Sequence, residues 1–136
     1  MRKILKRESG FTLIELIIVM VIIGILVLLL LPNLSAGPKR ARDSRRKSDL
    51  RTVQSALEQY FADKNAYPSG DYPGLTSFLV PDYTKSMPSD PTAGQSYTYT
   101  PGPSGCTTSC TSFTLSANLE YNKDPNYPTY SVTNQQ

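Results

Sequence analysis

The chain has 136 residues, of which 14 are Lys or Arg and 11 are Asp or Glu, giving a formal net charge of +3, with two cysteines and no histidine. The positive excess comes from residues 1–10, which hold four basic side chains and one acidic side chain, so it does not indicate nucleic-acid binding. The sequence contains no histidine, no Gly-x-Ser-x-Gly and no phosphate-binding loop, and we therefore do not expect an enzyme.

Residues 1–10 form a short basic segment that ends at Gly10. A secretory signal peptide has an apolar core of about 7–15 residues followed by an Ala-x-Ala-like cleavage site. Here the apolar run is longer, and the small residues after it lead directly into Pro38. We therefore predict that residues 1–10 are a leader that is removed before the apolar run, which leaves the mature protein anchored in the membrane.

An apolar run extends from Phe11 to Leu31, and within it only Thr12, Glu15 and Gly24 are not strongly apolar. A helix of this length reaches about 30 Å, which matches the hydrocarbon thickness of a bilayer. Backbone polar groups in lipid must be satisfied within the segment, so the segment should be helical. We predict a single-pass transmembrane helix over residues 11–31.

Glu15 is the unusual residue of this helix, because an ionised carboxylate inside a membrane span costs about 3 kcal/mol or more when it is unpaired. The segment contains no Lys, Arg or His that could pair with it. We expect the partner of Glu15 to come from outside the helix, or from an amine created by cleavage of the chain.

Gly10, followed by the sequence Phe-Thr-Leu-Ile-Glu-Leu and the apolar run, resembles the N-terminal segment of type IV prepilins and type II secretion pseudopilins. The resemblance implies that a membrane-embedded aspartyl peptidase, prepilin peptidase, cuts after Gly10 and methylates the new N-terminus at Phe11. It also implies that Glu15 pairs with the N-terminal amine of a neighbouring subunit during assembly. The alternative is a signal anchor with a chance glutamate.

Basic residues flank the span on both sides, so the positive-inside rule does not settle its orientation. The resemblance implies a protein of the inner (cytoplasmic) membrane with a cytoplasmic N-terminus and an extracytoplasmic head. The same resemblance implies that the protein later forms part of an extracellular or periplasmic filament.

Pro32 ends the apolar run, and Gly24 lies eight residues before it. A proline inside a helix removes a hydrogen bond and kinks the helix. The resemblance implies that the stretch between Gly24 and Pro32 can lose helicity when subunits pack into a filament. Pro38 indicates either a second break or a simple exit kink from the membrane.

Residues 32–64 are predicted to continue the helical spine. The apolar side chains of the later part recur at i, i+3, i+7, i+10 and i+11, which is typical of one helical stripe that packs on a core. These residues are Leu50, Val53, Leu57, Tyr60 and Phe61.

A basic cluster occupies residues 39–51, with seven basic and two acidic side chains. Three interpretations stay open: contact with anionic lipid headgroups, pairing with acidic surfaces of neighbouring subunits, and DNA binding. No aromatic residues are interleaved to stack on bases, so nucleic acid is the partner we expect least.

Residues 65–136 are predicted to form a loop-rich β head. Alternation predicts strands over residues 96–100 and 111–119 that pair as an antiparallel hairpin, and a third short strand over residues 130–133. The expected fold class is α+β, with a long kinked N-terminal helical spine packed on a small antiparallel sheet, as in pilins.

The head also resembles the major pseudopilin of type II secretion systems in the order of its features. These are Tyr67-Pro68, Gly74-Leu75 with Leu79-Val80, Pro88-x-Asp90-Pro91, Tyr97-x-Tyr99 and Pro101-Gly102. The chain departs from that pattern at Thr92, where the family has tryptophan. The family's Gly- and Asp-rich calcium-binding end is also not visible, and the resemblance leaves a type IV pilin of similar build equally open.

Cys106 and Cys110 are the two cysteines of the chain. Two cysteines without histidine cannot complete a tetrahedral zinc site. In an extracytoplasmic domain they are expected to form a local disulfide that pins the tip of the hairpin, and a pair of free thiols is the alternative.

Four alternating oxygen donors, Glu120, Asn122, Asp124 and Asn126, follow the second predicted strand. Calcium takes six to eight oxygen ligands and tolerates loops, so calcium is a candidate ligand here. The alternative is a polar turn before Pro128. No cofactor is required for the role proposed below.

We predict a structural subunit, a pilin or pseudopilin, that prepilin peptidase processes and that polymerises into a type IV pilus or a type II secretion pseudopilus. Association along one screw axis is open-ended and makes filaments, and Glu15 would set the register because burying it unpaired is costly. The alternative function is a membrane-anchored extracytoplasmic binding module that does not polymerise. Expected partners are other copies of the chain, related pilin subunits, prepilin peptidase, the inner-membrane assembly machinery and membrane lipid.

Overall fold

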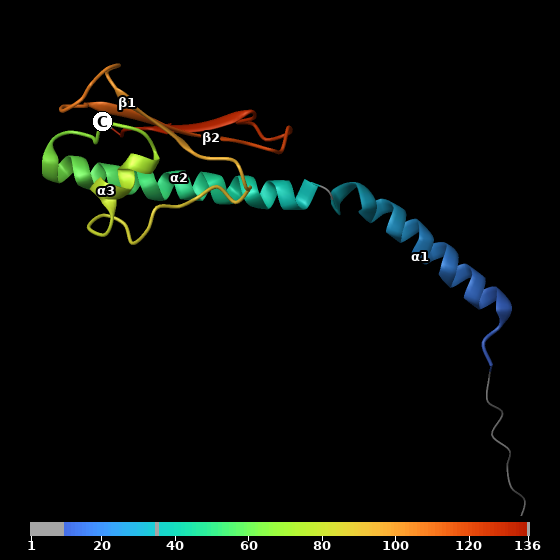
Figure 1. The fold of residues 1–136 in the computed structure, drawn as a ribbon. Helices are drawn as coiled ribbons and strands as arrows, with labels where there is room; N and C mark the ends of the chain where they lie inside the picture. The colour runs from blue at the N-terminus through green and yellow to red at the C-terminus, as the bar shows by residue number, and fades with distance from the viewer. Residues whose placement is uncertain (1–9, 35, 136) are drawn as a thin grey trace, which may run out of the picture. The chain divides into compact units, whose positions relative to one another are not determined.

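The computed structural model describes residues 10–34 and 36–135, and the chain divides into two compact units, Met1–Ala36 and Gly37–Gln136 (Figure 1). The first unit contains helix α1 (Leu13–Leu34). Its stretch Leu13–Leu30 is long and apolar enough to cross a membrane, with a mean hydropathy of 3.4 and none of it buried within the chain. Within the part of the chain that the structure describes, this stretch is the one candidate membrane span, and it lies near the N-terminus.

Helix α1 continues through Gly24 and past Pro32 to Leu34. The following helix, α2 (Ala36–Lys64), already includes Pro38, for which the sequence left open a second break or a simple exit kink. Pro38 is tolerated because it lies in the first turn of α2, where backbone N–H groups have no partner inside the helix and a missing N–H costs nothing.

The second unit places α2 along one face of a three-stranded sheet (Figure 1). The strands are β1 (Thr98–Gly102), β2 (Ser112–Asn118) and β3 (Thr129–Thr133), all antiparallel in the order β1-β2-β3. The predicted α+β architecture with a small antiparallel sheet is thereby confirmed. The short elements η1 (Pro73–Leu75) and α3 (Thr76–Leu79) connect α2 to the sheet.

Strand β1 is displaced by two residues from its expected position at 96–100, and it includes Pro101. Pro101 pairs with Phe113 of β2, and β1 is an edge strand. An edge strand accepts proline because the missing N–H need not serve a further strand.

The core lies between the apolar stripe of α2 and the inner face of the sheet. Leu50, Val53 and Leu57 of α2 are buried as their spacing predicted, and Phe113 and Leu115 of β2 meet them from the sheet. Alternate residues of a strand point to the same face, which explains why Ser112 and Thr114 are not part of this core.

Buried tyrosines complete the core, and their hydroxyls donate hydrogen bonds to protein groups. Tyr67 donates to Glu58 (3.0 Å), and Tyr97 donates to Asp49 (2.7 Å). Tyr99 donates to a backbone carbonyl at 2.6 Å. Burial raises the pKa of all three phenols, so they remain neutral donors at physiological pH.

Candidate functional site

The start of α1 is closed by a capping box made of Thr12 and Glu15. The Glu15 N–H donates to Thr12 Oγ1 (3.3 Å), while the Thr12 N–H and hydroxyl both donate to Glu15 Oε2 (3.1 and 3.0 Å). This reciprocal arrangement satisfies donors that the helix leaves free at its first turn. The Thr-x-x-Glu spacing before an apolar run is the sequence signal for it, which our sequence analysis did not use.

The capping box corrects our expectation that Glu15 must find every partner outside its own helix. Among the described residues, its carboxylate has two local partners, the N–H and the hydroxyl of Thr12, and both are neutral, so they do not compensate its negative charge. A charge that enters an apolar environment still needs a cation. Glu15 is therefore positioned at the helix start with its charge available to a partner of opposite sign.

Gly10 and Phe11 lie just before α1, in backbone that is neither helix nor strand, and Phe11 is 85% exposed. A Cβ built at Gly10 would meet no atom of the chain within 4 Å. The fold of this chain therefore does not require glycine at position 10, and a requirement for it would come from an enzyme that binds this segment.

Gly24 lies inside α1, where glycine costs about 1 kcal/mol relative to alanine. A Cβ at Gly24 would also meet nothing within 4 Å, so packing within the chain does not explain the residue. The helical backbone includes Pro32, but its side chain lies outside the described side chains. A role for Gly24 and Pro32 in loosening the helix during assembly stays a prediction.

The head contains a buried charge network centred on Arg46, which the sequence analysis did not anticipate. Arg46 is 0% exposed. Its guanidinium donates to Asp43 (2.7 Å), to both oxygens of Asp90 (2.7 and 2.8 Å) and to Thr92 (2.8 Å), and it lies 2.7 Å from a carboxylate oxygen of Glu120. Removing one member of such a network leaves an uncompensated buried charge, which is strongly destabilising. The network thus ties α2 to the loop before β1 and to the end of β2.

Asp43 extends this network to the backbone after β2. Its carboxylate oxygens accept hydrogen bonds from the N–H groups of Glu120 (3.0 and 3.1 Å) and Tyr121 (2.8 Å). Asp43 is 2% exposed. A buried carboxylate is stable when it accepts several hydrogen bonds and faces a cation, and both conditions hold here.

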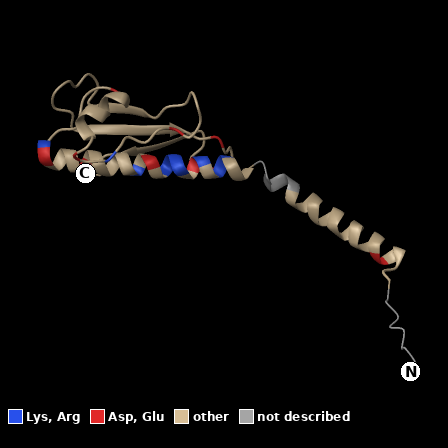
Figure 2. Ribbon diagram, turned by 60° about the horizontal axis from the view of Figure 1, so that its bottom comes forward, with Lys and Arg blue, Asp and Glu red and all other residues tan. Residues whose placement is uncertain are grey.

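Three further basic residues of α2 contact the segment that joins β2 to β3. Arg42 donates twice to Glu120 (2.8 and 2.5 Å), and Lys47 donates to both oxygens of Asp124 (2.7 Å each). Arg40 lies over the ring of Tyr121, with its guanidinium carbon 4.4 Å from the centroid. Figure 2 shows this run of basic residues along the first half of α2.

These contacts change the interpretation of the basic cluster at residues 39–51. Arg42, Arg46 and Lys47 bind carboxylates of the head, so they are not free to serve lipid headgroups or neighbouring subunits. Arg45 is different, since its side chain is 64% exposed and 3.8 Å from Asp49 on the same helix. The sequence did carry a signal for this pairing: residues 39–51 have seven basic and two acidic side chains, whereas residues 52–136 have three basic and seven acidic.

The network lowers the pKa values of its carboxyl groups. Hydrogen bonds from Arg42 lower the pKa of Glu120 to about 2 against the opposing effect of burial, and Arg46 and Thr92 contribute in the same direction. Burial of Asp90 opposes its ionisation, but hydrogen bonds from Arg46 and from the Thr92 N–H outweigh it, so the pKa of Asp90 is lowered as well. Both carboxyl groups are therefore ionised at neutral pH.

Acid is expected to destabilise the head through Glu120. A carboxyl group whose pKa is lower in the folded state contributes stability that is complete above its unfolded pKa and is lost as the pH falls through its folded pKa. The free energy of unfolding should therefore be level above about pH 5 and fall between about pH 5 and pH 2. Urea unfolding at stepped pH, followed by tyrosine circular dichroism, measures this profile. The Glu120→Gln variant should show a shallower slope, and an unchanged slope would contradict this assignment.

Cys106 and Cys110 form a disulfide, with a Cα–Cα distance of 5.4 Å. Cys110 is completely buried, and its carbonyl accepts a hydrogen bond from the Tyr67 N–H at 2.8 Å. The disulfide closes the tip of the β1–β2 connection, and the hydrogen bond between Tyr67 and Cys110 holds this tip against the segment that follows α2.

Removing this disulfide is expected to lower the free energy of unfolding by about 2 kcal/mol, the chain-entropy value for a ring of about five residues. The Cys106→Ala/Cys110→Ala double variant tests this by urea unfolding against the oxidised wild type. The wild type under a reducing agent serves as the matched control and should lose a similar amount. If the double variant unfolded at the same urea concentration as the oxidised wild type, the bridge would carry no stability.

Three of the four predicted calcium ligands already have partners within the chain. Glu120 faces Arg42 and Arg46, Asp124 faces Lys47, and Asn126 donates to Asp124 through its N–H (2.9 Å) and its side-chain amide (3.2 Å). Within residues 10–34 and 36–135, no group of three or more His, Cys, Asp or Glu side chains is arranged to hold a metal ion. Calcium binding by this segment is not supported by its geometry.

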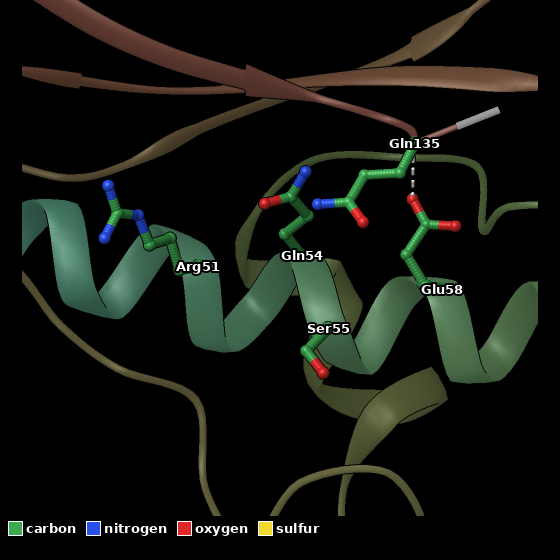
Figure 3. Close-up of a pocket in the computed structure, with 5 residues that line it drawn as sticks. All are labelled: Arg51, Gln54, Ser55, Glu58 and Gln135. Carbon is green, nitrogen blue, oxygen red and sulfur yellow. Dashed lines mark hydrogen bonds between the residues drawn. The ribbon is translucent and has the colours of Figure 1, made fainter.

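The C-terminal end of the chain is held on α2 beside a shallow groove lined by Arg51, Gln54, Ser55, Glu58 and Gln135 (Figure 3). The Gln135 N–H donates to Glu58 (3.0 Å), and the Gln54 side-chain amide donates to the Thr133 carbonyl (2.6 Å). The groove has polar walls but no paired nucleophile and base. The two hydrogen bonds beside it fix the end of β3 on α2.

Comparison with known proteins places these features in a family. The family described as the prokaryotic N-terminal methylation motif matches residues 5–31. The chain is 33% identical over 112 residues to the type II secretion system core protein G of Aeromonas hydrophila, a match that covers 74% of this chain and 78% of the relative. It is 34% identical over 113 residues to the core protein G of Pseudomonas aeruginosa, covering 74% and 79% of the two chains.

A third relative, the core protein G of Klebsiella michiganensis, is 34% identical over 116 residues, covering 74% of this chain and 81% of its own. No solved structure matches the chain significantly. The sequence relatives decide between the two filament families that our sequence analysis left open, because they belong to type II secretion and share most of the chain. The chain belongs to the family of the type II secretion system core protein G, the major pseudopilins.

Proposed function

We propose that the chain is a structural subunit that is cut after Gly10, methylated at Phe11 and assembled into the pseudopilus of a type II secretion system. The observation that carries this proposal is the start of α1. An exposed Gly10-Phe11 bond precedes a capped helix, and among residues 10–34 and 36–135 no cation pairs with the carboxylate of Glu15. The family of the chain supports the same function.

The proposed subunit is stored in the inner membrane through α1, with the head of residues 37–136 on the extracytoplasmic side. All described residues of α1 are exposed, and apart from Glu15 and Gly24 they are apolar, so the helix has a large apolar surface that needs a covering environment. Lipid supplies that cover before assembly, and the α1 helices of other subunits supply it in the filament. Proposed partners are therefore copies of this chain, related pilin subunits, prepilin peptidase and the inner-membrane assembly machinery.

Intact mass and N-terminal sequencing of the protein from native membranes test the processing part of this proposal. The expected chain begins at N-methylated Phe11. A chain that begins at Met1, or that is cut near Ala36, would instead favour a membrane-anchored or secreted binding module that does not polymerise. The second part is tested by shearing or extracting filaments and detecting the processed chain in them.

A further inference from the structure

The segment between β2 and β3, residues 119–128, carries the carboxylates of Glu120 and Asp124. It is a compact connection, closed by the Leu119 N–H on the Pro128 carbonyl (2.8 Å) and the Asp124 N–H on the Tyr121 carbonyl (3.0 Å). The alternating oxygen donors of this segment made calcium a candidate ligand in the sequence. We call residues 119–128 the C-terminal loop.

We propose that basic side chains of α2 bind the carboxylates of the C-terminal loop in place of a metal ion. These ion pairs hold the loop, and the head folds without calcium. The carboxylate oxygens of this loop are already satisfied. Glu120 Oε1 accepts from Arg42 (2.8 Å) and Thr92 (2.9 Å) and lies 2.7 Å from Arg46 Nη2, while Oε2 accepts from Arg42 (2.5 Å). At Asp124, Oδ1 and Oδ2 each accept from Lys47 at 2.7 Å.

The carboxylate of Asp43, which is the third one near the loop, also has its own hydrogen-bond donors. It accepts from the N–H groups of Glu120 and Tyr121 and from Arg46. Calcium needs six to eight oxygen ligands. The three carboxylates could supply these only if they released the guanidinium and ammonium groups that they now bind.

Electrostatic repulsion also disfavours calcium binding at the C-terminal loop. A divalent cation at the loop would stand close to the positive charges of Arg42, Arg46 and Lys47, which surround Glu120 and Asp124. Like charges at such short distances repel strongly when the groups are partly removed from water. The spacing of the three residues puts them on adjacent turns of α2, so one helix supplies a complete set of cations for the loop.

The experiment uses the full chain in detergent micelles and hydrogen–deuterium exchange of the C-terminal loop. In the wild type, millimolar calcium and an excess of chelator should give the same exchange rates and the same unfolding temperature, because only a ligand that binds the folded state stabilises it. In the Arg42→Met and Lys47→Met variants the loop should exchange several-fold faster. The Arg45→Met variant is the matched control, since Arg45 lies on the same helix but is largely exposed and does not contact the loop.

Two results would overturn the proposal. One is a rise in the unfolding temperature, or slower loop exchange, when calcium is added to the wild type. The other is loop exchange in Lys47→Met that matches the Arg45→Met control. The Lys47 side chain is 21% exposed and lies outside the buried Arg46 network, so we expect Lys47→Met to fold. This variant therefore still tests the proposal if Arg42→Met does not fold. The outcome does not depend on whether the chain polymerises.

Discussion

Replacing Glu15 with Val is expected to abolish incorporation of the chain into filaments while leaving membrane insertion and leader removal intact. The substitution removes a carboxylate from an apolar helix, so insertion into lipid becomes more favourable, not less. It also removes the charge that would pair with the N-terminal amine of Phe11 in a neighbouring subunit. Without this carboxylate, docking in a wrong register no longer buries an unpaired charge, so the correct register loses its advantage. The measurement is the amount of processed subunit in sheared filaments relative to the amount in membranes.

The capping box makes a sharper control available. Glutamine at the third position of a helix can keep the reciprocal cap with Thr12, but it carries no charge. Glu15→Gln should therefore fail to assemble like Glu15→Val if the charge sets the register. Normal filaments from Glu15→Gln, together with none from Glu15→Val, would show that the cap and not the charge matters, and normal filaments from both would exclude any role for Glu15 in assembly.

Replacing Gly10 with Val is expected to leave the leader attached to essentially all of the protein. A side chain at position 10 meets no atom of the chain, and the residue precedes α1, so the fold should be unchanged. The effect would arise in the peptidase, whose site would have to accept a β-branched residue next to the bond that it cuts. The readout is intact mass, which separates the full chain from one that begins at Phe11.

Gly24→Ala is the matched control for this experiment. It also adds a side chain at a glycine with nothing within 4 Å, but it lies far along α1 from the cleavage point. Leader removal should be normal in Gly24→Ala. If Gly10→Val also matured to a chain that begins at Phe11, the peptidase assignment would be wrong.

Elements with a strong local pattern could be predicted from the sequence. The apolar run at residues 11–31 predicts a helix that is hydrophobic on all sides, because nearly every position is apolar. Such a helix cannot be a half-buried surface helix, so it indicates a membrane span. The spacing of Leu50, Val53 and Leu57 determines which face of α2 is buried, and the alternation of Phe113, Leu115 and Ala117 determines the inner face of β2.

Boundaries were less predictable, because they depend on neighbours in space. Pro101 looked like the end of a strand, but it lies inside β1 since that strand is at the edge of the sheet. Pro38 looked like a break, but it lies in the first turn of α2, where it disturbs no hydrogen bond.

By itself, the sequence predicted the membrane helix, the motif at Gly10, Phe11 and Glu15 for which we propose roles in cleavage and assembly, and the two faces of the head, because each is encoded by residues close together in the chain. Only the tertiary structure decided how the charges pair. Arg46 meets Asp90 across 44 residues of sequence, and Lys47 meets Asp124 across 77. The composition shows that basic and acidic residues are segregated, but a carboxylate can be assigned to its cation only after the fold brings α2 beside the loops that carry Asp90 and Asp124.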